Sequence, residues 1–541
     1  MSHPDLRGKA GLLIDDIPEM RAAVRIQLAD LGLEKCDAAR NVKEAIERIA
    51  ANRYDLIVCD YNLGQGADGQ QLLELVRRRK TLPMSSAFLM ITGETGYEQV
   101  STAAEFSPDD YLIKPFTAEM LGSRIARILD KKAGLKSIYQ HLGEKGDSAK
   151  AIGACDVLLA EKSRYTLDVL RIKGDLLLES DRRDEALALY QTVLDQRATP
   201  WAQVGKARAL AALGNPAEAQ EYLQRALEAY PNYLAAYDSL AQLLEKSDKS
   251  AAQQVVELAL KVAPSTRRQR QLGSLALDNQ DFGRAEEAFR RAVDKDRTGF
   301  FKSHDDYAGL AKSCVAQGKV QEALTAVKDM GTHFVPTPEL LARQAAVESL
   351  VQTKAGNKEA AKAALQRALT VQSESSLDPS AALEIAGACF ASGDEERAKS
   401  IIQAVAEDHH ENDDVLERAQ AVFHAAGRAD EGSVFLEATR KRMIKLNNDA
   451  VAMARSGDLD KAVAMLQEAA DRLVNNAQVS INAALALLMR AQKQGITVAV
   501  TEQVYRYIVQ AQRANPSHPR LAEVAKFYRK VAPDAPQLEG I

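Results

Sequence analysis

A short pattern that recurs along most of this chain limits its fold more than any other feature. An alanine is followed four residues later by an aromatic or aliphatic residue, and three residues after that by a residue that is usually alanine. The first four copies begin 33 residues apart, and the next three follow at steps of 38, 38 and 37 residues. Repetition at such a period indicates stacked helix pairs. The copies begin at Ala186, Ala219, Ala252, Ala285, Ala323, Ala361, Ala398 and Ala462.

A second small residue lies twelve positions before most of these alanines, where the first helix of a pair would cross the second closely. The last step is 64 residues, so we expect a degenerate repeat between, at about 415–437. Because one helix pair cannot bury its apolar faces alone, stacking would make the core and expose an extended groove. The small residues are Gly174, Ala207, Gly273, Ala311, Ala386 and Ala450.

This periodicity resembles the tetratricopeptide repeat (TPR), although the tryptophan of that consensus is essentially absent and the longer steps suggest longer turns. The resemblance implies an all-α solenoid over residues 135–541, with roughly nine to ten helix pairs. Its groove would bind a peptide or a partner helix. The alternatives are an unrelated α-solenoid, such as a HEAT-like array, or a long helical bundle.

The N-terminal part differs, because short apolar runs there end in polar residues. The runs 12–14, 56–59, 87–91 and 111–113 are followed by Asp15-Asp16, Asp60, Thr92 and Lys114. Open α/β sheets build their sites at such strand ends. Three neighbouring carboxylates would repel unless a divalent cation held them, and oxygen ligands suit Mg²⁺. The lysine and hydroxyl suit a transferred phosphoryl group, so the pattern predicts a phosphoacceptor site.

The spacing of these residues resembles the receiver domain of two-component response regulators over about residues 8–130. The resemblance implies a doubly wound, flavodoxin-like domain with five parallel strands, assigned to residues 1–134. It also implies that Asp60 is the phosphorylated nucleophile and that Asp16 binds Mg²⁺ directly. Asp15 would hold the metal through water, and Asn62 would offer its backbone carbonyl.

By the same resemblance, Thr92 would hydrogen-bond the phosphoryl oxygens and Lys114 would pair with them. Tyr111 matches the switch aromatic of the family, and Lys114-Pro115 would be a cis peptide. The glycine-rich loop 64–69 departs from the usual receiver.

The competing interpretation of this region is a redox or nucleotide-binding domain, which needs a phosphate-binding glycine motif after the first strand. Residues 15–18 offer none. Asn62 and Glu94 flank the predicted site and are polar, so we expect the phosphoryl group to be short-lived.

The helices expected in the receiver have clear ends. Pro18 suits a first turn and Gly32 a helix stop, and the cations 77–80 suit a helix C-terminus better than a nucleic-acid patch. The apolar face of the first helix is expected to contain Met20, Val24, Ile26, Leu28 and Leu31.

The last receiver helix should begin near Thr117 and stop at Gly134 in the left-handed conformation. The first pair of the array would then use Ile138, Leu142 and a helix at about 151–159. The apolar positions expected on the last receiver helix are Met120, Leu121, Ile125, Ile128 and Leu129.

The charge and the cysteine content of the chain limit the partners and the compartment that we expect for it. The formal net charge is −5 and no basic stripe or helix-turn-helix follows the receiver, so we expect no nucleic-acid partner. Five scattered cysteines indicate a reducing compartment, the bacterial cytoplasm. The apolar run at 11–14 is too short for a membrane span.

Two histidine-containing clusters lie outside the receiver. His409 and His410, with Glu411 and Asp413, are interpreted as a solvated turn rather than a metal site. His304, with Asp305 and Asp306, is interpreted as the acidic first turn of a helix.

These observations favour a response regulator phosphorylated by a histidine kinase or phosphotransfer protein, with an unknown protein partner in the repeat groove. It would not be an enzyme beyond its own phosphoryl transfer and dephosphorylation. The alternative is a phosphorylation-independent scaffold that uses both regions for docking. An adaptor that regulates an enzyme is not separable from the first hypothesis.

Overall fold

A five-stranded parallel sheet lies in the N-terminal part of the chain, with the order β2-β1-β3-β4-β5. This order is that of the flavodoxin-like doubly wound fold, so the predicted fold class is confirmed. The strands are β1 (Ala10–Ile14), β2 (Lys35–Ala39), β3 (Leu56–Asp60), β4 (Ala87–Thr92) and β5 (Asp110–Ile113).

The computed structural model describes residues 6–64, 67–93, 108–142, 146–295, 302–456, 458–516, 518–533 and 535–538. The chain forms two compact units, residues 1–309 and 310–541. The division falls inside a helix of the array, so the sheet and the first helix pairs share one unit. The boundary expected at residue 134 stays a prediction.

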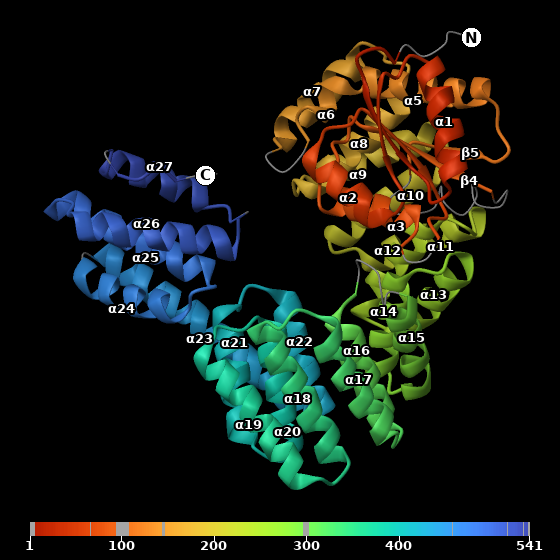
Figure 1. Ribbon diagram of the computed structural model, residues 1–541. Helices are drawn as coiled ribbons and strands as arrows, with labels where there is room; N and C mark the ends of the chain where they lie inside the picture. The colour runs from red at the N-terminus through yellow and green to blue at the C-terminus, as the bar shows by residue number, and fades with distance from the viewer. Residues whose placement is uncertain are drawn as a thin grey trace. The chain divides into compact units, whose positions relative to one another are not determined.

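Helices cover both faces of the sheet (Figure 1). Helices α2 (Val42–Ala51) and α3 (Gly69–Arg78) pack on one face. Helices α1 (Pro18–Asp30) and α5 (Ala118–Gly134) pack on the other. The three central strands, β1, β3 and β4, are almost entirely buried, as a parallel sheet between two helix layers requires.

The ends of α1 agree with the sequence, but two expected apolar positions of the receiver helices do not. Pro18 opens α1, and Gly32 follows it with φ of 91°. Ile26 was expected in the core and is 64 % exposed, because Val24 and Leu28 face the sheet and a residue midway between them points away. Met120 on α5 is exposed for the same kind of reason, since Leu121 and Ile125 take the buried stripe.

Gly134 was expected in a left-handed helix stop, and this is wrong. It is the last residue of α5, and Leu135 caps the helix with φ of −105°. A Cβ atom at Gly134 would lie 2.6 Å from the ring of Tyr165. The glycine therefore admits an aromatic ring from the array.

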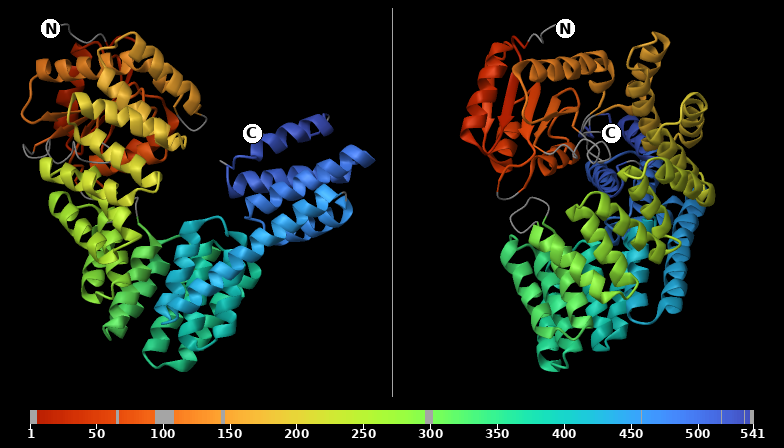
Figure 2. Two further views of the ribbon diagram at one scale, coloured as in Figure 1. Left: turned by 180° about the vertical axis from the view of Figure 1, so that it is seen from behind. Right: turned by 90° about the vertical axis from the view of Figure 1, so that its right-hand side faces the viewer.

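The rest of the first unit is a series of antiparallel helices (Figure 2). The short helix α6 comes first and ends before Leu142, which was expected in the first pair, and α7 contains the helix expected at about 151–159. The helices are α6 (Lys136–Tyr139), α7 (Ser148–Ala160), α8 (Thr166–Glu179), α9 (Arg183–Gln196), α10 (Pro200–Ala212), α11 (Pro216–Ala229), α12 (Leu234–Glu245), α13 (Lys249–Val262), α14 (Thr266–Asp278), α15 (Phe282–Lys295) and α16 (His304–Ala316).

The second unit continues the series in the same manner. Among the described helices of the chain, none has the length and apolar character needed to cross a membrane. The helices are α17 (Val320–His333), α18 (Pro338–Lys354), α19 (Lys358–Glu374), α20 (Pro379–Ser392), α21 (Glu395–Asp408), α22 (Asp413–Ala425), α23 (Ala429–Ser456), α24 (Leu459–Arg472), α25 (Ala477–Gln494), α26 (Val498–Ala514) and α27 (Leu521–Val531).

The repeated alanines occupy the positions that the periodicity predicted. Each lies on the second helix of a pair and is at most 4 % exposed. The degenerate repeat falls on α22 and the start of α23. Helix α23 has 28 residues and continues without a turn into the next repeat, where Ala450 is fully buried.

Two aromatic rings of the array lie in notches made by glycines. Cβ atoms at Gly174 and Gly205 would lie 2.6 Å and 2.3 Å from the ring of Tyr190. Three repeats later, Cβ atoms at Gly273 and Gly309 would lie 2.7 Å and 2.4 Å from the ring of Phe289. In both cases a ring on the second helix of a pair packs against glycines on two first helices, that of its own pair and that of the next pair.

The turn that contains His409, His410, Glu411 and Asp413 was expected to be solvated, which is wrong for His410, whereas Glu411 and Asp413 are exposed. His410 is only 4 % exposed, and its Nδ1 accepts a hydrogen bond of 2.8 Å from Asn476. The turn before α25, distant in sequence, covers it. Burial, followed by the charge of Arg440, lowers the pKa of His410 to about 4.

Candidate functional site

The polar residues predicted to converge do meet at the carboxyl ends of the strands. Parallel pairing aligns Asp60 with Ile91 and Thr92 with Ile113. The N–H of Lys114 donates to the carbonyl oxygen of Thr92 over 2.7 Å, so the β4–β5 ladder extends to the lysine. Strand register thus brings residues from four strands to one edge.

Three carboxylates form the centre of this edge. Oxygen atoms of Asp15, Asp16 and Asp60 lie within 4.8 Å of one another. Asp15 and Asp60 are 2 % and 6 % exposed, whereas Asp16 faces solvent. Oxygen-only ligands that remain open to water on one side fit Mg²⁺, which keeps several waters in protein sites.

The pKa of Asp15 reflects the close approach of these three carboxylates. Burial, and then the charges of Asp60 and Asp16, raise the pKa of Asp15 above its usual value. The N–H of Ile17 donates to Asp15 over 2.8 Å, and this bond and Lys114 oppose the shift. The ionised cluster therefore needs cationic partners.

Lys114 supplies one such cation. Its Nζ lies 2.7 Å from Oδ2 of Asp60 and 3.6 Å from Oδ2 of Asp15. The Lys114-Pro115 peptide is cis, as the receiver resemblance implied. An ammonium group in contact with Asp60 is placed to neutralise charge added to that carboxylate.

Thr92 and Tyr111 lie close to the same edge but are covered. Thr92 is 1 % exposed at the end of β4, and Tyr111 is 5 % exposed in the core formed with Phe88 and Met90. The roles of both residues in signalling stay predictions, as does metal binding by the Asn62 carbonyl.

Two glycines that the sequence interpretation did not assign are needed to shape the site. Gly64 has φ of 75°, and a Cβ atom there would lie 2.8 Å from Oδ2 of Asp16. A Cβ atom at Gly69 would lie 2.4 Å from the carbonyl oxygen of Asp60. The side chain of Asn62 accepts from the N–H of Gly64 over 3.1 Å. In the sequence, the unusual glycine content of loop 64–69 was the feature that could have indicated these close contacts.

Part of this neighbourhood lies outside the described residues, namely Gln65, Gly66 and the segment that contains Glu94. The expectation of a short-lived phosphoryl group, which used Glu94, therefore stays a prediction.

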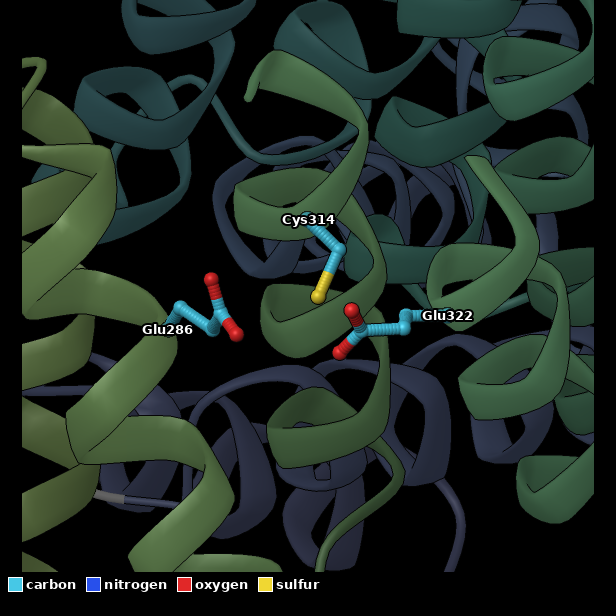
Figure 3. A group of neighbouring side chains, drawn as sticks. All are labelled: Glu286, Cys314 and Glu322. Carbon is cyan, nitrogen blue, oxygen red and sulfur yellow. The ribbon is translucent and has the colours of Figure 1, made fainter. Parts of the chain in front are cut away.

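A second group of possible metal ligands contains Cys314 and Glu322, whose side chains point toward one another in Figure 3. Both belong to the second unit, and Glu286, also drawn there, belongs to the first. Two ligands within one unit do not make a metal site, so no function is assigned to them.

Comparison with known proteins agrees with this geometry. Residues 12–126 match the model of the response regulator receiver domain, and residues 177–244 and 270–330 match tetratricopeptide repeat models. Chemotaxis protein CheY of Pseudomonas aeruginosa is 33 % identical over 126 residues, which are 23 % of this chain and 98 % of that protein. CheY-3 of Vibrio cholerae is 33 % identical over 123 residues, 22 % of this chain and 91 % of that protein.

Solved structures resemble parts of the chain. A tetratricopeptide repeat protein from Parabacteroides merdae is 18 % identical, with a TM-score of 0.31, and covers 44 % of this chain and 92 % of its own. CheY4 of Vibrio cholerae is 28 % identical, with a TM-score of 0.21, and covers 23 % and 100 %. Through its N-terminal sheet this chain belongs to the response regulator receiver family, and tetratricopeptide repeats follow the receiver.

Proposed function

We propose that this chain is a response regulator whose receiver accepts a phosphoryl group on Asp60 and whose repeats bind a protein partner. The observation that carries the proposal is the contact of Lys114 with Asp60 beside two further carboxylates. An isolated carboxylate at a strand end would need neither the lysine nor the acidic pair. The same contact favours phosphorylation over the phosphorylation-independent scaffold.

The proposed step is a phosphoryl transfer from a phosphohistidine of a kinase or phosphotransfer protein. An oxygen of Asp60 forms a bond to phosphorus, the phosphorus–nitrogen bond breaks, and the leaving imidazole nitrogen takes up a proton. Lys114 then pairs with the phosphoryl oxygens, and Thr92 donates a hydrogen bond to them. Mg²⁺ held by Asp15, Asp16 and Asp60 would neutralise phosphoryl charge.

The route from the site to the array runs along β5 in this proposal. Among the described strands, β5 pairs with β4 alone, so one of its edges has no described strand partner that resists a shift. Lys114 follows one end and Asp109 precedes the other. The Oδ1 of Asp109 pairs with Nζ of Lys132 on α5 over 2.7 Å, and Lys132 is 6 % exposed.

Lys132 in turn contacts both sides of the junction. It donates to the carbonyl oxygen of Met84 over 2.7 Å and lies 5.1 Å from the centre of the Tyr139 ring on α6. Two residues earlier on α5, Asp130 accepts a hydrogen bond from the hydroxyl of Tyr165 over 2.6 Å. A shift of β5 would reach the first helices of the array through these contacts.

The proposal is tested by incubating the full chain with Mg²⁺ and a small acyl phosphate and measuring its intact mass. One added phosphoryl group is expected, lost in Asp60→Asn and on chelation. Asp30→Asn, an exposed change at the end of α1, is the matched control and should be modified as the wild type is. A wild-type chain that stays unmodified in donor excess would overturn phosphorylation and favour the scaffold.

A further inference from the structure

The second unit contains two cores of buried apolar residues that share one helix. The first core extends from Ala342 on α18 to Leu436 on α23, and the second core from Met443 on α23 to Leu538. Among the described helices, α23 alone contributes to both, and it runs from one group of helices to the other in Figure 1. The two cores are therefore joined through the middle of α23.

The middle of α23 has no large apolar residue that could connect the two cores. Residues 437–442 read Glu-Ala-Thr-Arg-Lys-Arg. Within them, Thr439 is 2 % exposed, and its hydroxyl donates to the carbonyl oxygen of Phe435 over 2.9 Å. A threonine that bonds in this way to the residue four positions earlier often bends a helix. Residue 439 is therefore the place at which we expect α23 to bend.

Polar contacts join two turns on either side of this place. The end of α21 and the turn that follows it meet the turn between α24 and α25. The backbone N–H of Asn475 donates to Oδ1 of Asp408 over 2.8 Å, and its Nδ2 donates to Oδ2 of Asp408 over 2.6 Å. These two residues are 67 positions apart, so the contact skips one repeat and connects the next but one.

Asn476 makes the most buried part of this contact, with 2 % of its surface exposed. Its Oδ1 accepts from the N–H of Val479 over 3.0 Å and caps α25, so its Nδ2 points toward α21. That nitrogen donates to the carbonyl oxygen of Glu407 over 3.1 Å and to Nδ1 of His410 over 2.8 Å. The last carbonyl groups of a helix lack partners within it. Asn476 therefore joins the end of α21 to the start of α25.

The carboxylate of Glu407 adds two ion pairs. Its side chain is 9 % exposed and lies 3.2 Å from a guanidinium nitrogen of Arg442 on α23 and 3.4 Å from one of Arg472 on α24. Three helices thus meet at one carboxylate. The name clasp is used below for the contacts of Glu407, Asp408 and His410 with Arg442, Arg472, Asn475 and Asn476.

The clasp lies where the array departs from its regular form. In the other repeats a turn separates the second helix of one pair from the first helix of the next, whereas α23 continues through this position. The turns before and after it therefore meet directly. Every contact of the clasp is polar, and because water replaces polar partners that separate, the net contribution of each bond is small. Such a clasp can open while both apolar cores stay folded.

We infer that the clasp is a releasable brace on α23. While it is closed, the two cores move as one body. When it opens, the second core pivots about Thr439 and the curvature of the array changes. A partner that binds one arrangement better than the other would shift the clasp toward that state. The inference concerns the repeats alone and does not depend on phosphorylation of Asp60.

The test measures amide hydrogen exchange in the full chain and in Asp408→Ala, which removes both hydrogen bonds to Asn475. Amides 437–443 of α23 should exchange about 10-fold faster in the variant, because they lose protection when α23 bends. Amides of α19 and α26, one helix from each core, should be unchanged. Unaltered exchange at 437–443, or equal acceleration in both cores, would overturn the inference.

Three further variants locate the brace and the pivot. Asn475→Ala removes the side-chain bond alone and should accelerate the same amides less than Asp408→Ala does. Glu396→Ala, which removes an exposed carboxylate at the start of α21, is the matched control and should change nothing. Adding Thr439→Ala to Asp408→Ala should reduce the acceleration, because alanine favours a straight helix. Exchange in this double variant that is as fast as in Asp408→Ala would contradict a pivot at residue 439.

Discussion

Different kinds of side chain determine the structure of the receiver site and the stacking of the repeat array. In the receiver, a few polar groups from four strands meet at one edge, and Lys114 contacts Asp60 over 2.7 Å. In the array, no single polar group dominates, and alanines and glycines on successive helices determine how closely the pairs stack. The polar groups of the receiver therefore gather at one edge, whereas the packing contacts of the array are distributed along its length.

This contrast predicts different responses to substitution. A polar change at the receiver edge should remove chemistry and spare the fold, because the strands beneath it are held by their own apolar core. A small apolar change in the array should damage the fold, because each helix contact is also a packing limit.

The largest effect is expected at the receiver edge. Lys114→Met should slow phosphorylation of Asp60 by on the order of 100-fold, since it removes a preorganised cation from the site. The melting temperature should change little. The rate is followed by phosphate-affinity gel, with Lys43→Met on the exposed side of α2 as control. If Lys114→Met also lowers the melting temperature substantially, the receiver edge is needed for the fold as well, and the proposed difference between the two regions is wrong.

The second effect concerns the glycine notches. Gly205→Ala should lower the unfolding free energy by about 2 to 3 kcal/mol, because its Cβ would lie 2.3 Å from the Tyr190 ring. Chemical denaturation measures this. Gly153→Ala on α7, where nothing lies within 4 Å of the new Cβ, should stabilise by up to about 1 kcal/mol.

Adding Tyr190→Leu to Gly205→Ala should recover part of the loss, because a smaller side chain vacates the notch. If the double variant is as unstable as the sum of the two single variants, the notch is not the cause.

The third effect is a pH dependence confined to the second unit. Its main source is His410, whose pKa is about 4 in the folded chain, below the value of about 6.5 expected when unfolded. Burial also lowers the pKa values of His409 and His518, which act in the same direction. The unfolded state therefore binds more protons between these values, and stability falls as pH falls through that window. From about pH 7 to about pH 5 the loss should be about 2 kcal/mol.

The variant His410→Gln should flatten this pH dependence, and His424→Gln, at an exposed position on α22, should not. Denaturation at several pH values decides between them. An undiminished pH dependence in His410→Gln would assign the effect to other groups, such as His409 and His518.

The smallest effect is expected at the junction between the two regions. Tyr165→Phe removes the 2.6 Å hydrogen bond to Asp130 and should cost about 1 kcal/mol. With a phosphoryl mimic, the wild type should change hydrogen exchange in α8, and the variant should change it less. Tyr237→Phe is the control. Changes confined to the receiver in the wild type would mean that this junction does not couple the regions.

The sequence predicts elements whose causes are local and misses those whose causes are distant. Strand ends such as Asp60 are predictable because parallel strands share one carboxyl edge, and Ala186 and its equivalents because helix crossings repeat. The lack of space for a side chain at position 134 is due to Tyr165, and the burial of His410 involves Asn476. No local pattern contains those partners.

The role of Gly64 and Gly69 was missed for a similar reason. The glycine-rich loop is visible in the sequence, but its cause is the close approach of its backbone to Asp16 and Asp60.

Helix α23 has a mechanical consequence. Elsewhere a turn separates one repeat from the next, and a turn absorbs bending through a few backbone angles. Over its 28 residues α23 has no such turn, so one continuous helix belongs to the repeats on both sides of it. While the clasp is closed, bending of the second unit should be concentrated at its other turns. Helices α22 and α24 should move together with α23, on which both pack.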